Sequence, residues 1–119
     1  MSHPIVHFEM GYKDAGEAQK FFAGLFDWKF EEFGPVRMIS TGTDEGIAGH
    51  LSTPGKEPHN YCVVYVQVDD LQEYLDKAEK LGGKTMIPPT PVPGMGNFAW
   101  LNDPEGNIVG LWKADSTAA

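Results

Sequence analysis

Short segments in which apolar and polar residues alternate recur along the chain and predict strands with two unlike faces. In residues 5–12, His7 and Glu9 fall on the face opposite Phe8 and Met10. In residues 47–52, His50 falls on the face opposite its apolar neighbours. We expect the remaining strands at residues 28–33, 36–41, 61–68, 84–87, 97–101 and 107–113.

Two segments carry an apolar residue at every third or fourth position, which predicts amphipathic helices. Each follows an aspartate with a glutamate three residues later, the capping-box pattern of a helix start. These pairs are Asp14 with Glu17 and Asp70 with Glu73. We expect the first helix to pack through Ala18, Phe21, Phe22 and Leu25, and the second through Leu71, Tyr74, Leu75, Ala78 and Leu81.

The order of one strand, one capped helix and three strands occurs twice. At the offset that aligns Asp14 with Asp70, Leu25 also aligns with Leu81. We therefore predict a single α+β domain made of two βαβββ modules, with the helices outside and the other strand faces combined into a cup-shaped mixed sheet. The predicted parts are module one at about 4–53, a connector at 54–60, module two at about 61–113 and a frayed tail at 114–119.

Turn-forming residues punctuate the second module. The run from Asp103 to Asn107 combines Pro104, which fixes φ, with Gly106, which tolerates positive φ, and it predicts a hairpin turn. Residues 88–96 hold four prolines, so we expect a stiff loop there and a flexible lip at its glycine-rich end.

The composition and charge of the chain exclude several classes of function. A chain of 119 residues with 41% hydrophobic and 22% charged residues is typical of one globular domain. Its net charge of -8 argues against nucleic acid or an anionic membrane as a partner. The single cysteine, Cys62, excludes an intrachain disulfide and is expected in the core. With no long apolar run and no signal-peptide pattern, we expect a cytoplasmic protein.

These motifs, in this order, resemble the glyoxalase / bleomycin-resistance / extradiol-dioxygenase superfamily, also called vicinal oxygen chelate proteins. The resemblance covers about residues 4–113 and is closest to a small glyoxalase-related subgroup. It implies paired βαβββ modules around a cup, a small-molecule ligand or substrate, and a homodimer. The residues that carry it are Val6-His7-Phe8, Asp14, Leu25-Phe26-Asp27-Trp28, Val68-Asp69-Asp70-Leu71, the loop from Pro91 to Ala99, and Asp103-Pro104-Glu105-Gly106-Asn107.

The resemblance also implies a divalent metal held by four strand positions. In this chain those positions are His7, His50, Val63 and Gly110, so only the two histidines can bind a metal. Glu9 would be a third ligand, but it lies roughly 6.5–7 Å along the strand from His7. The alternatives are a pair of partly solvated histidines bonded to water or Glu9, and a metal-free general base.

A carboxylate on an inward strand face costs folding free energy unless it is paired or solvated, so Glu9 indicates a polar, water-filled cavity. We take His7, Glu9 and His50 as the candidate catalytic residues. Aromatic walls suit a flat or apolar ligand, and the small Gly110 would leave it room. The expected ligand-binding residues are Tyr65, Gln67, Phe98, Trp100 and Trp112.

Three functions remain open at this point. The first is an enzyme that carries out an isomerisation, a lyase step or an oxygenation on a small carbonyl or aromatic compound, with or without a metal. The second is a metal-free protein that binds or sequesters a small molecule, as bleomycin-resistance relatives do. The third is a dimeric structural remnant whose cup is filled by its own side chains.

Overall fold

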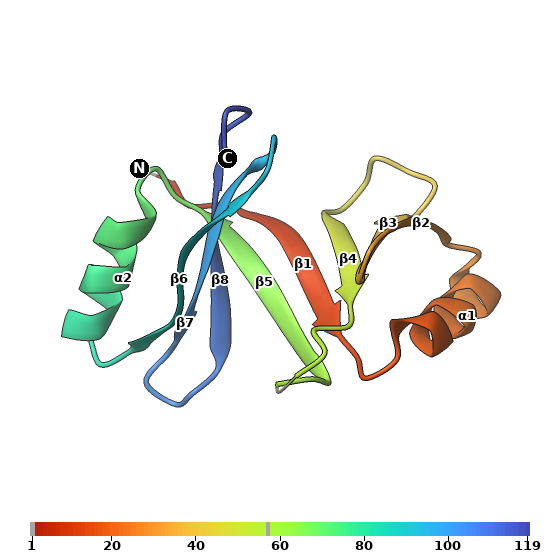
Figure 1. Cartoon of the computed structure of the whole chain (residues 1–119), viewed down its shortest axis with the longest axis horizontal. Coiled ribbons are helices and arrows are strands. Elements are labelled where there is room, and N and C mark those ends of the chain that lie inside the picture. Colours follow the sequence, from red (N-terminus) through yellow and green to blue (C-terminus); the bar gives the residue numbers. More distant parts are fainter. Residues whose placement is uncertain (1, 57) are drawn as a thin grey trace. The chain divides into compact units, whose positions relative to one another are not determined.

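The computed structural model describes residues 2–56 and 58–119. In this part of the chain, the order strand, helix, strand, strand, strand occurs twice (Figure 1). The predicted α+β fold of two βαβββ modules is therefore confirmed. The elements are β1 Ile5–Gly11, α1 Ala15–Phe26, β2 Lys29–Phe33, β3 Val36–Ser40, β4 Ala48–Ser52, β5 Tyr61–Gln67, α2 Leu71–Lys80, β6 Lys84–Val92, β7 Gly96–Asn102 and β8 Ile108–Ala114.

The chain divides into two compact units. The first unit is His7–Val63, and the second is Val64–Ala119 together with the N-terminal residues through Val6. The division passes through β1 and β5. The cup and the module bounds expected from the sequence stay predictions.

In the first unit the strands follow the order β2-β3-β4-β1. β1 runs parallel to β4, whereas the β2–β3 and β3–β4 pairs are antiparallel. The parallel register places Glu9 of β1 opposite His50 of β4. This pairing brings the polar faces of two strands that are distant in sequence onto one side of the sheet.

The helix α1 covers the other side of that sheet. Asp14 caps its start by accepting a hydrogen bond from the amide of Glu17, as the sequence predicts. Ala15 and Ala18 are buried against Leu51 of β4, with Phe22 beside them. The prediction that Phe21 and Leu25 pack against the sheet is wrong, because Phe21 is 61% exposed and Leu25 is 56% exposed. The buried stripe runs through Ala15, Ala18 and Phe22, and the helical turn of about 100° per residue points Phe21 away from it.

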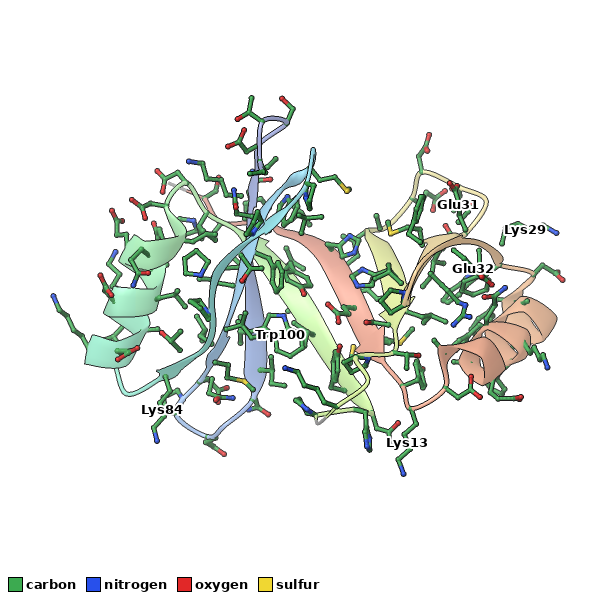
Figure 2. All side chains as sticks on the ribbon, in the orientation of Figure 1. Lys13, Lys29, Glu31, Glu32, Lys84 and Trp100 are labelled. Carbon is green, nitrogen blue, oxygen red and sulfur yellow. The ribbon has the colours of Figure 1, made fainter. Side chains whose placement is uncertain are left out.

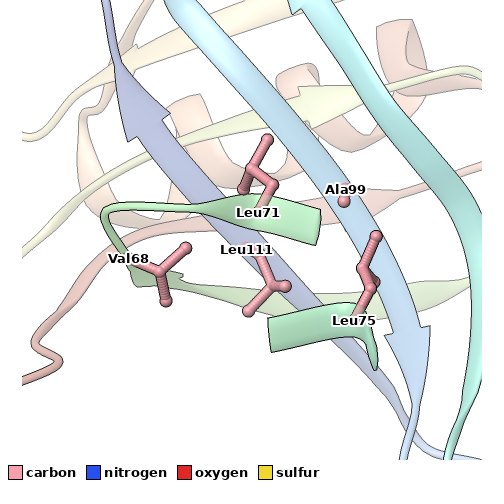
Figure 3. Close-up of a cluster of buried hydrophobic side chains, with 5 residues drawn as sticks. All are labelled: Val68, Leu71, Leu75, Ala99 and Leu111. Atoms are coloured by element: carbon pink, nitrogen blue, oxygen red, sulfur yellow. The ribbon is translucent and has the colours of Figure 1, made fainter. Parts of the chain in front are cut away.

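In the second unit the strands follow the order β5-β8-β7-β6, with β5 parallel to β8. Asp70 caps α2 by accepting from the amide of Glu73. Leu81, predicted as part of the apolar stripe, is 76% exposed because the helix ends before it. The core beneath α2, drawn in Figure 3, consists of Val68, Leu71, Leu75, Ala99 and Leu111.

The proline-rich segment is not a loop. β6 continues through Pro88, Pro89 and Pro91 as far as Val92 and pairs with β7. Prolines are tolerated there because β6 ends the strand order of the unit and its register shifts twice along the pair. An edge strand needs donors on one side only, so the missing amide hydrogens cost little.

Three further expectations meet different outcomes. The turn between β7 and β8 forms as predicted: Asp103 accepts from the amides of Glu105 and Asn107, and Gly106 has a φ of 91°. The tail is not frayed, because Ala118 accepts from the amide of Gly94. Cys62 is exposed instead of buried. Within the described residues, neither helix has the length and apolar run that a membrane crossing requires.

Candidate functional site

His7, Glu9 and His50 lie together in the first unit. The Nε2 atom of His7 is 2.7 Å from Nδ1 of His50, and the two ring centroids are 4.9 Å apart. On the far side of the His50 ring, Nε2 lies 3.4 Å from Oε1 of Glu9. The three side chains therefore form a line, in which His50 stands between the carboxylate of Glu9 and the ring of His7.

Glu9 is almost completely buried, with 7% of its surface exposed. Burying an unpaired carboxylate would cost several kcal/mol, so its partners decide whether the fold tolerates it. One oxygen faces His50, and the other accepts a short hydrogen bond from the hydroxyl of Tyr61. The carboxylate is thus held from both sides.

Tyr61 was not among the residues expected at the site. Its ring lies where a side chain on Gly11 would stand, so a β-carbon at Gly11 would overlap it. Gly11 is two residues beyond Glu9 on β1 and shares its face, which lets the Tyr61 hydroxyl reach the carboxylate. Gly11 follows the inward-facing His7 and Glu9 on β1, and its missing side chain was a signal that another residue could occupy this space. A glycine does not identify which side chain that is.

The hydroxyl of Tyr61 stays protonated over the whole physiological range. Burial raises its pKa most, and the hydrogen bond to Glu9 and the charge of Glu9 raise it further. A hydrogen bond with the buried Ser52 opposes these effects but does not reverse them. Tyr61 is therefore a hydrogen-bond donor to Glu9 and not a base.

His7 is neutral near pH 7. Burial lowers its pKa from 6.5 to about 4, the neighbouring His50 lowers it as well, and Glu9 acts in the opposite direction. A neutral imidazole has one donor and one acceptor nitrogen.

The order of donors along the line follows from the carboxylate, which can only accept. In a neutral His50 ring whose Nε2 donates towards the ionised Glu9, Nδ1 is the acceptor nitrogen. Nε2 of His7 must then donate to it, and Nδ1 of His7 carries the lone pair. The arrangement is a relay that can accept a proton at His7 and place the positive charge on His50, beside the carboxylate.

The expected divalent metal does not fit this arrangement well. Nε2 of His7 and Nδ1 of His50, 2.7 Å apart, face each other as hydrogen-bond partners, so in this arrangement they are turned towards each other and not towards a shared metal. Glu9 approaches the opposite nitrogen of His50, the place of a carboxylate that orients a ligand. The third family position, Val63, is fully buried and apolar. Among the described residues, no cluster of three His, Cys, Asp or Glu side chains has the spacing of a metal site.

The expected ligand-binding residues belong to the second unit. Trp100 donates a hydrogen bond of 2.9 Å from Nε1 to the hydroxyl of Tyr65, and Phe98 contacts the Tyr65 ring edge-on at 6.4 Å. The room expected above Gly110 is filled, because a β-carbon there would overlap the Tyr65 ring. Trp112 packs over Gly96 in the same way, and Gln67 is exposed. Trp100, labelled in Figure 2, is 6% exposed. The binding role of these residues stays a prediction.

The fold and this arrangement can be set beside known proteins. Residues 4–111 match the model of the Glyoxalase/Bleomycin resistance protein/Dioxygenase superfamily. The match covers most of the chain, so the chain belongs to this superfamily.

A relative in Mycobacterium tuberculosis, described as "Putative glyoxylase CFP32", is 30% identical over 110 residues. The match takes 86% of this chain but only 42% of the relative, so the chain spans about two fifths of that protein's length.

Two solved structures show the same fold. Methylmalonyl-CoA epimerase from M. tuberculosis superposes with a TM-score of 0.64 at 12% identity, covering 93% of this chain and 87% of that chain. A Mn(II)-bound glyoxalase from Novosphingobium aromaticivorans superposes with a TM-score of 0.57 at 20% identity, covering 98% of this chain and 40% of that chain. The superfamily thus includes members that hold a divalent metal.

Proposed function

We propose that this protein catalyses proton transfer on a small carbonyl compound, as a lyase or isomerase. The observation that carries the proposal is the unbroken line from the buried Glu9 through His50 to His7. A catalytic base needs an acceptor nitrogen, a route for the proton and a stabilised final charge. The relay supplies all three with side chains of the chain itself.

In the proposed step, Nδ1 of His7 takes a proton from the carbon next to the carbonyl group. The proton on Nε2 of His7 passes to Nδ1 of His50, and the electron pair of the broken C–H bond moves onto the carbonyl oxygen as an enolate. The positive charge comes to rest on His50 beside Glu9. Return of a proton to a different carbon, or to the other face, completes an isomerisation.

The low pKa of His7 explains why a relay is useful. With a pKa of about 4, an isolated His7 would be too weak a base for a carbon acid near neutral pH. Passing its proton to His50 moves the charge next to a carboxylate, where it is stabilised. Tyr61 keeps that carboxylate in place.

Membership of the superfamily supports a small-molecule substrate, and the description of the M. tuberculosis relative supports glyoxylase-type chemistry. The donor set does not favour the dioxygenase alternative, because it offers two imidazoles and a carboxylate on the wrong side of one of them.

The test is hydrogen exchange with solvent. Purified protein without a histidine tag is incubated in D₂O with 2-oxoaldehydes, 2-hydroxyketones and 2-oxo acids, and loss of the carbon-bound proton is followed by NMR. We expect catalysed exchange with at least one compound, retained in EDTA, and lowered about 10²-fold or more in His7→Ala and His50→Ala. His3→Ala, outside the relay, is the matched control and keeps full activity. Exchange that is unchanged in His7→Ala, or that requires an added metal, would overturn the proposal.

The alternative is a binding protein without chemistry. It is favoured by the loss of metal ligands at two family positions, Val63 and Gly110. In that case a ligand found by thermal shift would bind the wild type without any exchange. His50→Ala would then weaken binding without any turnover to lose.

We also propose that two copies associate. Phe21, Leu25 and Phe26 of α1 are all more than half exposed, and an exposed apolar patch of this kind is typical of a protein contact. Sedimentation of the wild type and of a Phe21→Ser, Leu25→Ser variant tests this. A dimer that becomes monomeric supports it, and a wild-type monomer contradicts it.

A further inference from the structure

A hollow lies in the first unit, where β1 ends. It has a volume of about 340 Å³ and is lined by Tyr12, Lys13, Thr53, Gly55, Lys56 and His59. Figure 2 shows Lys13 just beyond the end of β1, on the way to α1. The other walls come from Thr53, which directly follows β4, and from Gly55, Lys56 and His59. None of these residues belongs to the relay.

The lining of this hollow is positively charged, although the chain as a whole carries a net charge of -8. Two of the nine lysines and arginines border it, and no acidic residue is among its described lining residues. Of the acidic residues next to these lysines in sequence, Asp14 caps α1 and accepts from the amide of Glu17, and Glu57 lies outside the described residues.

Among the described residues, these two lysines, like Lys29, lack the ion pairs that the other cations of the first unit form. Lys20 pairs with Glu17 at 3.8 Å, and Arg37 pairs with Glu32 at 3.5 Å. Within residues 2–56 and 58–119, Lys13 and Lys56 enter no ion pair. Their charges are therefore not neutralised by a carboxylate of the described chain.

Neutral donors complete the wall. Thr53 accepts a hydrogen bond of 3.0 Å from the amide of Ala15 through its hydroxyl oxygen, which leaves the hydroxyl hydrogen to be donated. Tyr12 contributes a phenol hydroxyl that donates a long hydrogen bond, 3.9 Å, to the sulfur of Met10. Gly55 adds no side chain that would cover the opening.

We propose that this hollow binds a small, multiply charged oxyanion, namely the phosphate or the paired carboxylates of a metabolite. Two ammonium groups with hydroxyl donors between them match an oxyanion, because such a group accepts several hydrogen bonds and carries the opposite charge. The inference is independent of the relay and stands whether or not the proposed catalysis is correct.

The experiment is an NMR titration of the ¹⁵N-labelled protein at constant ionic strength, with inorganic phosphate in one series and malonate in the other. We expect saturable shifts at the amides of Lys13, Thr53, Gly55 and Lys56 with at least one anion. The series that saturates at the lower concentration identifies the source of the oxyanion. In the double variant Lys13→Gln, Lys56→Gln, affinity should fall by about tenfold or more.

Lys29→Gln is the matched control, because Lys29 is an exposed lysine of the same unit that does not border the hollow. Its affinity should equal that of the wild type, and the spectra themselves show whether each variant is folded. Shifts that never saturate with either anion, or a double variant that binds as the wild type does, would overturn the proposal. Shifts centred on His7 and His50 instead would also overturn it, because the anion would then bind at the relay.

Discussion

The Nε2 atom of His7 and the Nδ1 atom of His50 lie 2.7 Å apart, a hydrogen bond between two histidines that are 43 residues apart in sequence. A bond of this kind requires one ring to donate and the other to accept. The carboxylate of Glu9 on the far side of His50 fixes which is which. The direction of proton transfer between the two rings depends on this order of donor and acceptor.

Tyr61→Phe should lower the free energy of unfolding by about 1.5–3 kcal/mol. The change removes a donor to a buried carboxylate, and hydrogen bonds to charged groups are worth about that much. Urea unfolding at pH 7 measures the effect. Tyr74→Phe is the control, because the Tyr74 hydroxyl bonds His3 at an exposed position and its loss should cost less than about 0.5 kcal/mol. Equal costs for the two variants would contradict the importance of the Tyr61 contact.

Gly11→Ala should destabilise the protein by about 1–3 kcal/mol, because the new β-carbon would displace the Tyr61 ring. Gly24→Ala is the matched control. Gly24 lies in α1 with open space around it, so alanine there should stabilise the protein by up to about 1 kcal/mol. Thermal unfolding of both variants gives the signs. A Gly11→Ala variant as stable as the wild type would show that Tyr61 does not need that space.

The stability of the protein should fall as the pH drops from about 6.5 towards 4. Folding lowers the pKa of His7 to about 4, so below pH 6.5 the unfolded chain binds a proton that the folded chain resists. The contribution is complete above pH 6.5 and is lost on acidification. Its slope cannot exceed about 1.4 kcal/mol per pH unit, and the partial exposure of the ring keeps it smaller.

Urea unfolding of the wild type and of His7→Gln at pH 7, 6, 5 and 4.5 tests this dependence. The variant should lose less stability over the interval than the wild type does. Parallel curves for the two proteins would mean that His7 titrates normally in the folded state.

Leu75→Ala should cost about 2–5 kcal/mol of stability, because Leu75 is 1% exposed in the core beneath α2. Leu81→Ala should change the stability by less than about 0.5 kcal/mol, since Leu81 is 76% exposed. Chemical unfolding of the pair separates the two positions. A similar loss in both variants would contradict the position at which α2 ends.

Alternation along strands was sufficient to place His7, Glu9 and His50 on inward faces, because a strand has a period of two whatever its neighbours are. It did not reveal that Glu9 and His50 stand opposite each other, since the parallel register of β1 and β4 depends on the connection between them. Tyr61 was missed for a related reason. Its contact with Glu9 depends on the empty space at Gly11, and a glycine does not specify what fills it.

The buried face of the helix α1 could not be predicted from the helical period alone. Its first turns hold two alanines and its later turns hold phenylalanines, so more than one apolar stripe satisfies the helical period. The small alanines face the sheet because they allow a close approach, and the larger Phe21 is left exposed. The prolines of β6 led to the wrong prediction of a loop. The cost of a proline in a strand depends on whether the strand is central or at an edge, and the sequence does not give that position.

The most direct test of the relay is the tautomeric state of its two histidines, measured by long-range ¹H–¹⁵N correlation on the wild type at pH 7. The account predicts that His7 and His50 each carry their proton on Nε2, and that Glu9→Gln disturbs the state of His50 while Glu31→Gln, a change in β2, does not. A proton on Nδ1 of His7, or a charged His7 ring, would contradict the relay.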